Sequence, residues 1–552
     1  MADAGRVWWE YMQHTSSAYA TELSITFPNV ATHLHFVLDR GGCVFDAHAP
    51  VIKLPEGASE DDHLALLGVL NSSTACFWLK QVSYPKGGDP MGGDGARVSA
   101  ESWSDRYEFT GTTLQEFPLP GELPLELGRR VDSLAQRLAG QEPSAVSGRG
   151  MPTRDVLDAA RAEHEGIRRR MIALQEELDW QVYGHYGLLT DGEVGQLAAS
   201  DVDSVPEIKL GERAFEIVLA RKAANNEIET AWFKRHGSTP ITEIPGHWPE
   251  WYQQVVQARI ALIEKRRDIG LIERPECKRR WATQPWEKKE TEALRTWLFD
   301  RCEKEDVWFA LRDGIRQPRT LTVNQLADAF RDDADMHSVA QLYANDHLGK
   351  RDLTLAEVLD SVVADQHVPY LAALRYKDSG LRKREQWERV WDQQREEDRT
   401  GQRLNIPVPP KYTTADFRKT SYWSQRGKLD VPKERFISYP DANPDSDPTL
   451  LLGWAGWDHK DQAQALVNVV NDRTEQAGWG TEPITPLLAG LAEVLPWVRQ
   501  WHGEYDDEWV GIPAEECQAF LDEQRAKHHL TEQKLRAWRP APSTRGRKAK
   551  KG

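Results

Sequence analysis

One stretch of this chain repeats its apolar residues at the spacing of a single long helix. The steps between them are four, three, four and four residues, close to the heptad spacing of a packed helical seam. The residues are Ile167, Met171, Leu174, Leu178 and Val182. Charged stretches, EHEGIRRR and QEEL, occupy the other faces, and Gly184 and Gly187 predict the end of the helix. We therefore expect residues 126–190 to form a helical spacer that packs on neighbouring elements.

The residues before this spacer combine strand and helix signals. The stretches TELSITF and HLHFVLD predict short strands, and GGCVFDAHAPVIKLPEG predicts a turn at its two glycines, Gly41 and Gly42, followed by two more strands. Ser59 precedes three acidic residues and predicts a helix start, because its side-chain oxygen can accept from free backbone N–H groups. Residues 1–125 are therefore expected to be an α/β unit.

The remainder is expected to be mainly α-helical, which makes the fold class α+β. Residues 191–400 contain amphipathic helices rich in tryptophan, and residues 401–537 combine a Pro- and aromatic-rich part with a last helical region. The basic tail at residues 538–552 has too little apolar content to fold and is expected to be disordered. A chain of 552 residues exceeds one hydrophobic core, so we expect these parts to be separate domains.

Composition narrows the setting in which the protein works. Five cysteines lie far apart without Cys-x-x-Cys or Cys/His spacing, which argues against a zinc module and a disulfide framework. No apolar signal region begins the sequence, and no run of about 18 apolar residues follows, so no membrane association is expected. We expect a cytoplasmic protein.

The sequence offers no catalytic, cofactor-binding or metal-binding constellation. It has no P-loop, no Gly-x-Ser-x-Gly and no His-Glu-x-x-His motif. The Gly-rich stretches DRGGCVF and PKGGDPMGGDG lack the strand and helix that would make them a cofactor loop. The sixteen histidines are scattered without ligand spacing. We therefore expect no catalytic, cofactor-binding or metal-ligating residue in this chain.

A basic and aromatic segment, residues 411–440, stands out because the whole chain is acidic, with a formal charge of −16. Cations there can neutralise phosphates, and rings among them can stack on bases. The stretch LDVPKERFISY, at the end of this segment, is expected to contain a strand. The candidate DNA-binding residues of this segment are Arg418, Lys419, Tyr422, Trp423, Arg426 and Lys428.

Two further basic runs could join the same surface. LRYKDSGLRKREQWERVW has cations on both sides of Gly380, where a helix stop is expected, and RPECKRRW is the other run. The candidate DNA-binding residues from these runs are Arg382, Lys383, Arg384, Lys278, Arg279 and Arg280. The composition alone is equally compatible with solvated faces that pair with the abundant acidic residues.

Several longer stretches resemble one family of DNA-modifying enzymes. FVLDRGGCVFDAHAPVIKLPEG and the residues up to YEFTGTTLQEFPLP resemble the specificity region of TaqI-like and Eco57I-like adenine DNA methyltransferases. The likeness continues through IRRRMIALQEELDWQVYGHYGLL, VPPKYTTADFRKTSYWSQRGKLDVPKERFISYP and ITPLLAGLAEVLPWVRQWHGE. Within that group the chain is most similar to the C-terminal half of PglX-type methyltransferases of Pgl/BREX phage-defence systems. The resemblance covers nearly the whole chain.

The resemblance implies a function whose catalytic part is missing here. The family transfers a methyl group from S-adenosylmethionine to adenine N6, using a Rossmann-like domain and an Asn-Pro-Pro-Tyr/Phe motif that holds the flipped base. The chain's only Pro-Pro pair is in PVPPKY, where Val408 replaces the asparagine and Lys411 the aromatic residue. We therefore expect the cofactor on a separate or missing catalytic domain, and the chain to be a split subunit or a remnant.

These observations predict a DNA-binding, target-recognition portion of an adenine-N6 DNA methyltransferase in phage defence. Residues 1–125 would form a TaqI-like target-recognition unit. Its expected partners are double-stranded DNA, a catalytic methyltransferase domain or subunit, and other phage-defence components. The alternative is a protein-interaction scaffold, whose Trp-rich helices would dock other defence components while the basic runs remain ordinary surface.

Overall fold

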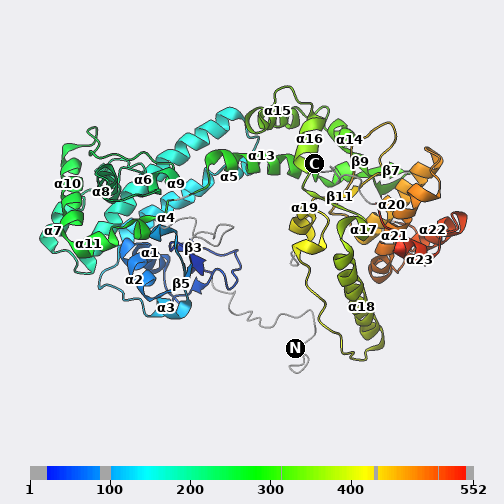
Figure 1. Cartoon of the computed structure of the whole chain (residues 1–552), viewed down its shortest axis with the longest axis horizontal. Helices are drawn as coiled ribbons and strands as arrows, with labels where there is room; N and C mark the ends of the chain where they lie inside the picture. The colour runs from blue at the N-terminus through cyan, green and yellow to red at the C-terminus, as the bar shows by residue number, and fades with distance from the viewer. Residues whose placement is uncertain are drawn as a thin grey trace, which may run out of the picture. The chain divides into compact units, whose positions relative to one another are not determined.

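The computed structural model describes residues 22–87, 101–281, 283–312, 314–427, 433–507 and 509–541. The chain is mostly helical with small sheets, so the predicted α+β class is confirmed (Figure 1). It divides into two units: the first comprises Gln13–Arg149 and Arg154–Lys289, and the second contains Gly150–Thr153 and Glu290–Gly552. That boundary falls inside the segment 191–400, and the finer five-part division stays a prediction.

The first unit begins with two small antiparallel sheets. In one, β1 pairs with β3 and β4, and in the other β6 pairs with β2 and β5. The strands are β1 (Ser24–Thr26), β2 (Val30–Ala31), β3 (Val37–Asp39), β4 (Val51–Ile52), β5 (Tyr84–Gly87) and β6 (Arg106–Glu108). The predicted strands of TELSITF and HLHFVLD are confirmed, whereas only one of the two expected after Gly42 forms.

Helices cover these sheets and supply most of the unit's core. They are α1 (Glu60–Leu70), α2 (Ser73–Val82), α3 (Gly111–Gln115), α4 (Leu125–Gly140) and α5 (Pro143–Arg149). As predicted, Ser59 begins α1: its hydroxyl accepts from the backbone N–H of Asp62, whose carboxylate accepts from the backbone N–H of Ser59. At the crossing of α1 and α4 a Cβ on Gly128 would lie 2.5 Å from Leu64 O, so this approach requires glycine.

The long helix predicted from apolar spacing is α6 (Arg154–His185), and its five seam residues are all buried. Gly184 lies within its last turn, and Gly187 follows with a left-handed φ of 66°. The unit is completed by α7 (Asp191–Leu197), α8 (Ala214–Ala224), α9 (Trp232–His236), α10 (Glu250–Lys265), α11 (Arg267–Ile272) and α12 (Pro275–Lys278). These helices enclose α6, and therefore its middle turns are buried on every side.

The second unit contains one mixed sheet in the order β10-β11-β12-β9 and a separate β7–β8 hairpin. Strands β10 and β11 are parallel, and the other pairs are antiparallel. The strands are β7 (Phe309–Arg312), β8 (Ile315–Pro318), β9 (Leu321–Thr322), β10 (His367–Pro369), β11 (Phe436–Tyr439) and β12 (Leu451–Trp454). Strand β11 confirms the strand expected in LDVPKERFISY.

Helices surround this sheet and account for most of the second unit. They are α13 (Trp286–Cys302), which begins just before the unit boundary, α14 (Val323–Ala329), α15 (Ala334–Tyr343), α16 (Leu355–Val363), α17 (Ala372–Arg375), α18 (Asp378–Thr400), α19 (Thr420–Tyr422), α20 (His459–Glu475), α21 (Thr481–Trp501), α22 (Pro513–Lys527) and α23 (Glu532–Ala537). In the described parts of the chain, no helix is both long enough and apolar enough to cross a membrane.

The helix stop expected at Gly380 is wrong. Helix α17 ends at Arg375, and Gly380 lies in the first turn of α18. A Cβ at this position would lie 2.5 Å from Asp416 O and 2.9 Å from Tyr376 Cδ1. Glycine is therefore present because another segment crosses the helix closely, and not because the helix ends there.

Candidate nucleic-acid interface

Two of the three basic runs lie together in the second unit. The segment after α18 returns to the start of that helix, where Tyr376 and Phe417 form an isolated antiparallel bridge. The backbone N–H of Lys377 donates to Asp416 O at 2.8 Å, and that of Arg418 donates to Arg375 O at 2.9 Å. The structure thus brings the candidates at 418–426 next to those at 382–384.

Aromatic rings hold this junction together. Tyr376 and Phe417 have ring centroids 4.8 Å apart, Tyr376 and Tyr412 are 5.1 Å apart, and Phe417 and Trp423 are 5.6 Å apart. Tyr422 is only 5% exposed and belongs to the same cluster, so its ring cannot stack on a base in this structure. Trp423 is half-buried and keeps part of its surface open. Most of the rings in this segment are therefore core residues.

A buried carboxylate anchors the segment to α18. Asp416 Oδ2 accepts from Lys383 Nζ at 2.6 Å, from Thr413 N at 2.7 Å and from Thr413 Oγ1 at 3.0 Å. Burial would raise the pKa of the Asp416 carboxyl, but these hydrogen bonds prevail and lower its pKa to about 2. Lys383 also donates to Lys411 O, so its ammonium stabilises the packing of this segment on α18.

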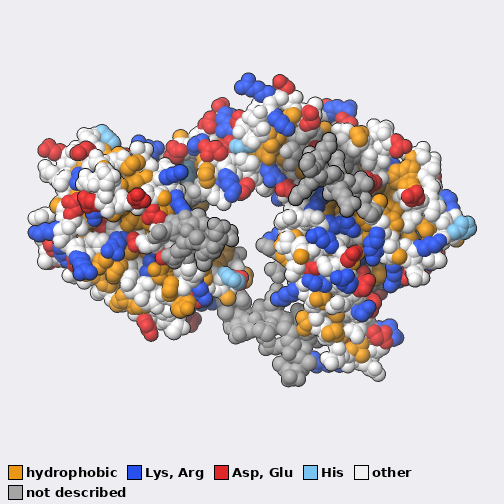
Figure 2. Space-filling view, in the orientation of Figure 1, with side chains coloured by type: hydrophobic (Ala, Val, Ile, Leu, Met, Phe, Trp, Pro, Cys, Tyr) orange, Lys and Arg blue, Asp and Glu red, His pale blue; other side chains and the backbone are white. Residues whose placement is uncertain are grey.

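Arg418 and Lys419 are the exposed cations on this framework. Nε of Arg418 donates to Ala373 O and Tyr376 O, each at 2.9 Å, while its two terminal nitrogens find no partner among the described residues. Lys419 is also exposed, and its Nζ lies 5.4 Å from the Tyr422 ring centroid. Figure 2 shows Lys and Arg side chains gathered over the region of α17, α18 and α19.

The remaining candidate residues of this unit differ in exposure and in the ion pairs that they form within the protein. Arg382 is exposed on α18. Arg384 forms ion pairs with Glu388 at 2.9 Å and with Glu493 at 2.6 Å, and Arg426 is ion-paired with Glu434. Lys428 lies outside the described residues. Of this group, Arg382 alone presents an exposed side chain that pairs with no carboxylate in the described chain.

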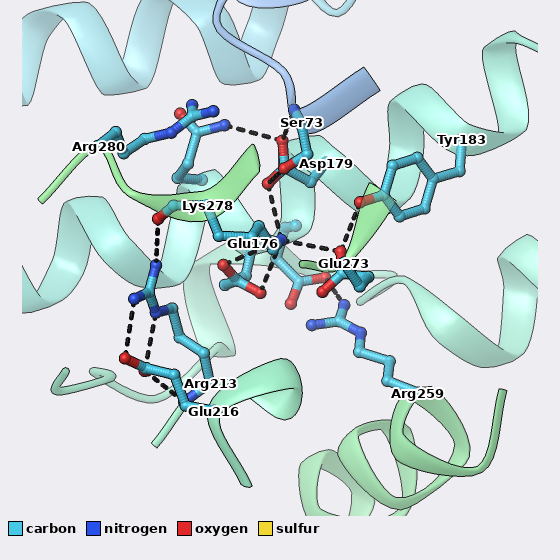
Figure 3. Close-up of polar contacts among 12 residues, drawn as sticks. Ser73, Glu176, Asp179, Tyr183, Arg213, Glu216, Arg259, Glu273, Lys278 and Arg280 are labelled. Carbon is cyan, nitrogen blue, oxygen red and sulfur yellow. Dashed lines mark hydrogen bonds and ion pairs between the residues drawn. The ribbon is translucent and has the colours of Figure 1, made fainter. Parts of the chain in front are cut away.

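The third basic run belongs to the first unit, and its lysine is enclosed. Lys278 is 1% exposed, and its Nζ lies 2.9 Å from both Asp179 and Glu273 and 3.2 Å from Glu176 (Figure 3). A phosphate cannot reach this ammonium in the structure. Its physical role is to compensate three buried carboxylates, and we therefore leave it out of a DNA surface.

Further buried ion pairs extend the same network. Arg213 pairs with Glu216 at 2.9 Å and also donates to Lys278 O (Figure 3). Arg259 pairs with Glu177 at 2.7 Å. Because the network joins α6, α8, α10 and the segment after α11, it fixes how these helices meet.

Protonation within the network is shifted by burial. Burial raises the pKa of the Glu176 carboxyl to about 7, although Lys278 acts in the opposite direction. Burial also opposes ionisation of Asp179, but Lys278 and Arg280 hold its pKa below its ordinary value. Below about pH 7 the two carboxyls therefore differ in charge state, with Asp179 the ionised partner of Lys278.

Arg279 and Arg280 join other parts of the first unit. The guanidinium of Arg279 lies 4.9 Å from the Trp103 ring centroid and donates to Trp103 O at 3.0 Å. Arg280 donates to Asn71 O, and both arginines are half-buried. Nothing places them on one surface with Arg418, because they lie in a different unit.

The structure also places a thiol beside an imidazole, which the sequence did not indicate. Cys76 Sγ lies 3.3 Å from His33 Nδ1, although 43 residues separate them. A hydrogen bond with Cys277 lowers the pKa of the Cys76 thiol, and His33 acts in the same direction. Both side chains are buried, so a substrate does not reach this thiol in the structure. Among the described residues, no group of three or more His, Cys, Asp or Glu could hold a metal ion.

Comparison with known proteins gives the chain a family. Residues 171–549 match the family described as "Domain of unknown function (DUF7008)". A curated protein of Streptomyces coelicolor, described as adenine-specific methyltransferase PglX, is 53% identical over 552 residues. The match covers 99% of this chain and 44% of the relative, of which it is the C-terminal part. No solved structure matches the chain.

The chain thus spans less than half the length of the curated relative it matches. The similarity confirms the resemblance to the C-terminal half of PglX-type methyltransferases that the sequence predicted. Because the family match covers residues 171–549, well over half of the chain, the chain belongs to the DUF7008 family.

Proposed function

We propose that this chain is the DNA-binding portion of a PglX-like adenine methyltransferase in phage defence. One observation carries the proposal: Arg418 and Lys419 are adjacent, exposed cations on a rigid junction of an otherwise acidic chain. The similarity to an adenine-specific methyltransferase makes duplex DNA the natural polyanion for such a surface.

The junction prepares Arg418 for a phosphate. Two backbone carbonyls take up its Nε–H and fix the plane of the guanidinium, so its terminal nitrogens can meet phosphate oxygens with little loss of side-chain entropy. Lys419 adds a second positive charge, Arg382 a third, and the open part of Trp423 can contact a sugar or base. Such contacts supply affinity and position rather than sequence selection.

Sequence selection and methyl transfer fall to other parts of the proposed enzyme. We assign target recognition to the N-terminal α/β part, residues 1–125, on its resemblance to TaqI-like specificity regions. The chain's own sequence has no Asn-Pro-Pro-aromatic tetrapeptide. We therefore assign S-adenosylmethionine and the flipped adenine to a catalytic domain outside this chain, which delivers the methyl group to DNA held here.

The test compares wild type with the double variant Arg418→Ala/Lys419→Ala by fluorescence anisotropy on random-sequence duplexes over a salt series. Each lost phosphate contact should reduce the slope of log affinity against log salt by about 0.9. We expect a fall of roughly 1–2 in the slope and weaker binding that is similar for every sequence. The matched control, Arg331→Ala/Lys350→Ala, removes two exposed cations of the same unit. Unchanged affinity and slope in the first variant would refute the proposal.

A second function, protein-interaction scaffold, has an observation in its favour. Large apolar side chains are exposed near the end of α21: Trp501 is 64%, Tyr505 61% and Val510 67% exposed. Such residues are typical anchors of protein interfaces. The same salt series separates the two functions, because a scaffold whose cations are ordinary surface would show no steep salt dependence with DNA.

A further inference from the structure

A cavity of about 130 Å³ lies in the second unit, beneath the junction described above. It is lined by parts of β10, β11, α17, α18, α20 and α21 and by the turn that follows α19. The lining residues that carry the argument are Arg375, Arg384, Arg426, Glu493, His459 and Trp497. We call it the arginine cavity.

Three guanidinium groups from three different elements meet at this cavity, against one lining carboxylate. Glu493 is already bound to Arg384 at 2.6 Å, and Arg426 is ion-paired with Glu434. For Arg375 the described chain provides no carboxylate partner, and its Nε is buried without a hydrogen-bond acceptor. Arg384 also pairs with Glu388, so the charge that the surrounding chain leaves without a partner is that of Arg375.

Such an arrangement is unfavourable unless an anion completes it. Buried donors without acceptors and cations without counter-ions both destabilise a fold, and at this cavity the two features coincide in Arg375. Burial, together with the like charges of Arg375 and Arg384, lowers the pKa of Arg426 to about 9. Burial is the larger cause, and repulsion from the two neighbouring guanidinium groups adds to it.

The walls favour a small anion. Tyr370 and Tyr439 stack with ring centroids 5.0 Å apart, and His459 and Trp497 stack at 5.5 Å, so two ring pairs form rigid sides. One water needs about 10–15 Å³ of comparable volume, so the cavity has room for a phosphate or diphosphate group. Planar guanidinium groups match phosphate oxygens in pairs.

We propose that the arginine cavity binds the phosphate group of a small phosphorylated compound. The three guanidinium groups are assigned to its oxygens, and Glu493 holds Arg384 in place between the ligand and α21. This site differs from the exposed Arg418–Lys419 surface, and it does not depend on DNA binding. A duplex carries its phosphates on a broad, stiff backbone, which a cavity of this size does not admit.

The test is calorimetric titration of the full chain with pyrophosphate, inorganic phosphate and AMP. The informative variant is Arg375→Gln, because this arginine has no carboxylate partner in the described fold and its removal breaks no ion pair. The matched control is Arg389→Gln, an exposed arginine on α18 that does not line the cavity.

We expect wild type to bind at least pyrophosphate, Arg375→Gln to bind it at least tenfold more weakly, and Arg389→Gln to agree with wild type within twofold. Arg375→Lys, which keeps the charge but loses the planar pair of donors, should lie in between and serves if the glutamine variant does not fold. Thermal melting gives a second readout, since pyrophosphate should raise the melting temperature of wild type and not that of Arg375→Gln.

Two results would overturn the proposal: no heat of binding with any of the three compounds at millimolar concentration, or equal affinity in wild type and Arg375→Gln. Titration of Arg418→Ala/Lys419→Ala keeps this outcome apart from the DNA proposal. That variant should lose DNA affinity and bind pyrophosphate as wild type does, and loss of both ligands together would count against a separate cavity site.

Discussion

Replacing Asp416 with asparagine tests the junction on which the proposed DNA surface is built. The carboxylate is 3% exposed and accepts from Lys383 and from the backbone and side chain of Thr413. Asparagine keeps the size of the side chain and removes its charge. We therefore expect residues 411–427 to open more often, while the rest of the second unit stays folded.

The size of the effect follows from the pKa of Asp416. A shift from 3.8 to about 2 favours the ionised, bound carboxylate by roughly 2.5 kcal/mol. Lys383 is 25% exposed, so water competes for its ammonium, and a loss of roughly 1–2 kcal/mol is the better expectation. This stability is present above the ordinary pKa of 3.8 and is lost as the pH falls towards about 2.

Hydrogen exchange followed by mass spectrometry measures this local opening. At neutral pH, a loss of roughly 1–2 kcal/mol corresponds to exchange about 5–30 times faster in peptides covering 411–427. The matched control is Asp392→Asn, which breaks an exposed ion pair with Arg395 one turn along α18 and should change exchange by less than about threefold. The reasoning fails if both variants exchange alike in these peptides.

Other substitutions test the packing and the buried charges. Gly380→Ala should destabilise by about 1–3 kcal/mol in thermal unfolding, because its Cβ would meet Asp416 O, whereas Gly166→Ala in α6, where a Cβ meets nothing within 4 Å, should stabilise by roughly 0.5–1 kcal/mol. Lys278→Met leaves three buried carboxylates without their cation and should cost roughly 3–5 kcal/mol in denaturant unfolding, with the exposed Lys209→Met near zero. In wild type, the Glu176 carboxyl keeps its proton to about pH 7 when folded but loses it near 4.5 when unfolded, so its contribution to stability falls as the pH rises between these values. Melting temperatures at pH 5 and 7.5 should therefore differ less in Glu176→Gln than in wild type.

Local patterns in the sequence predicted the elements whose causes are local. The helix cap at Ser59 depends on residues three apart, and the extent of α6 depends on a periodic apolar seam and a following glycine. Both signals can be read directly from the sequence, and both elements form as predicted. Strands β9 and β10 were not predicted, because strands of two or three residues carry too little pattern and exist through their pairing with β12 and β11.

The acidic residues of α6 show where local pattern ends. Glu176 and Glu177 were placed on the outer faces of the helix by their charge, yet both are buried, as is the adjacent Asp179. A helix enclosed on all sides buries whichever residues it carries, and each carboxylate is compensated from a distant segment, among them Lys278 and Arg259. The nearby Trp180 and Tyr183, off the apolar seam, were the available signal for that enclosure.

The basic and aromatic segment was correctly singled out, but its rings and cations divide in a way that only packing decides. Tyr422 and Phe417 lie in a core, whereas Arg418 and Lys419 between them remain outside. Alternation of apolar and charged residues in an irregular segment does not say which side faces the protein, since that depends on the helix against which the segment packs. The sequence therefore identified the segment, whereas only the structure shows which of its residues are buried and which are exposed.

The buried cations of the two units differ in one respect that bears on function. Lys278 meets three carboxylates and keeps its charge within a completed network, which is what a structural role requires. Arg375 meets none among the described residues and stands beside two more guanidinium groups at an open volume. The second arrangement gives the fold no ion pair, since the guanidinium of Arg375 lies 5.6 Å from the Tyr376 ring centroid but meets no carboxylate in the described chain. Its presence is explained when negative charge arrives from outside the chain, and this is why the search for a ligand should begin at the arginine cavity rather than at the larger network around Lys278.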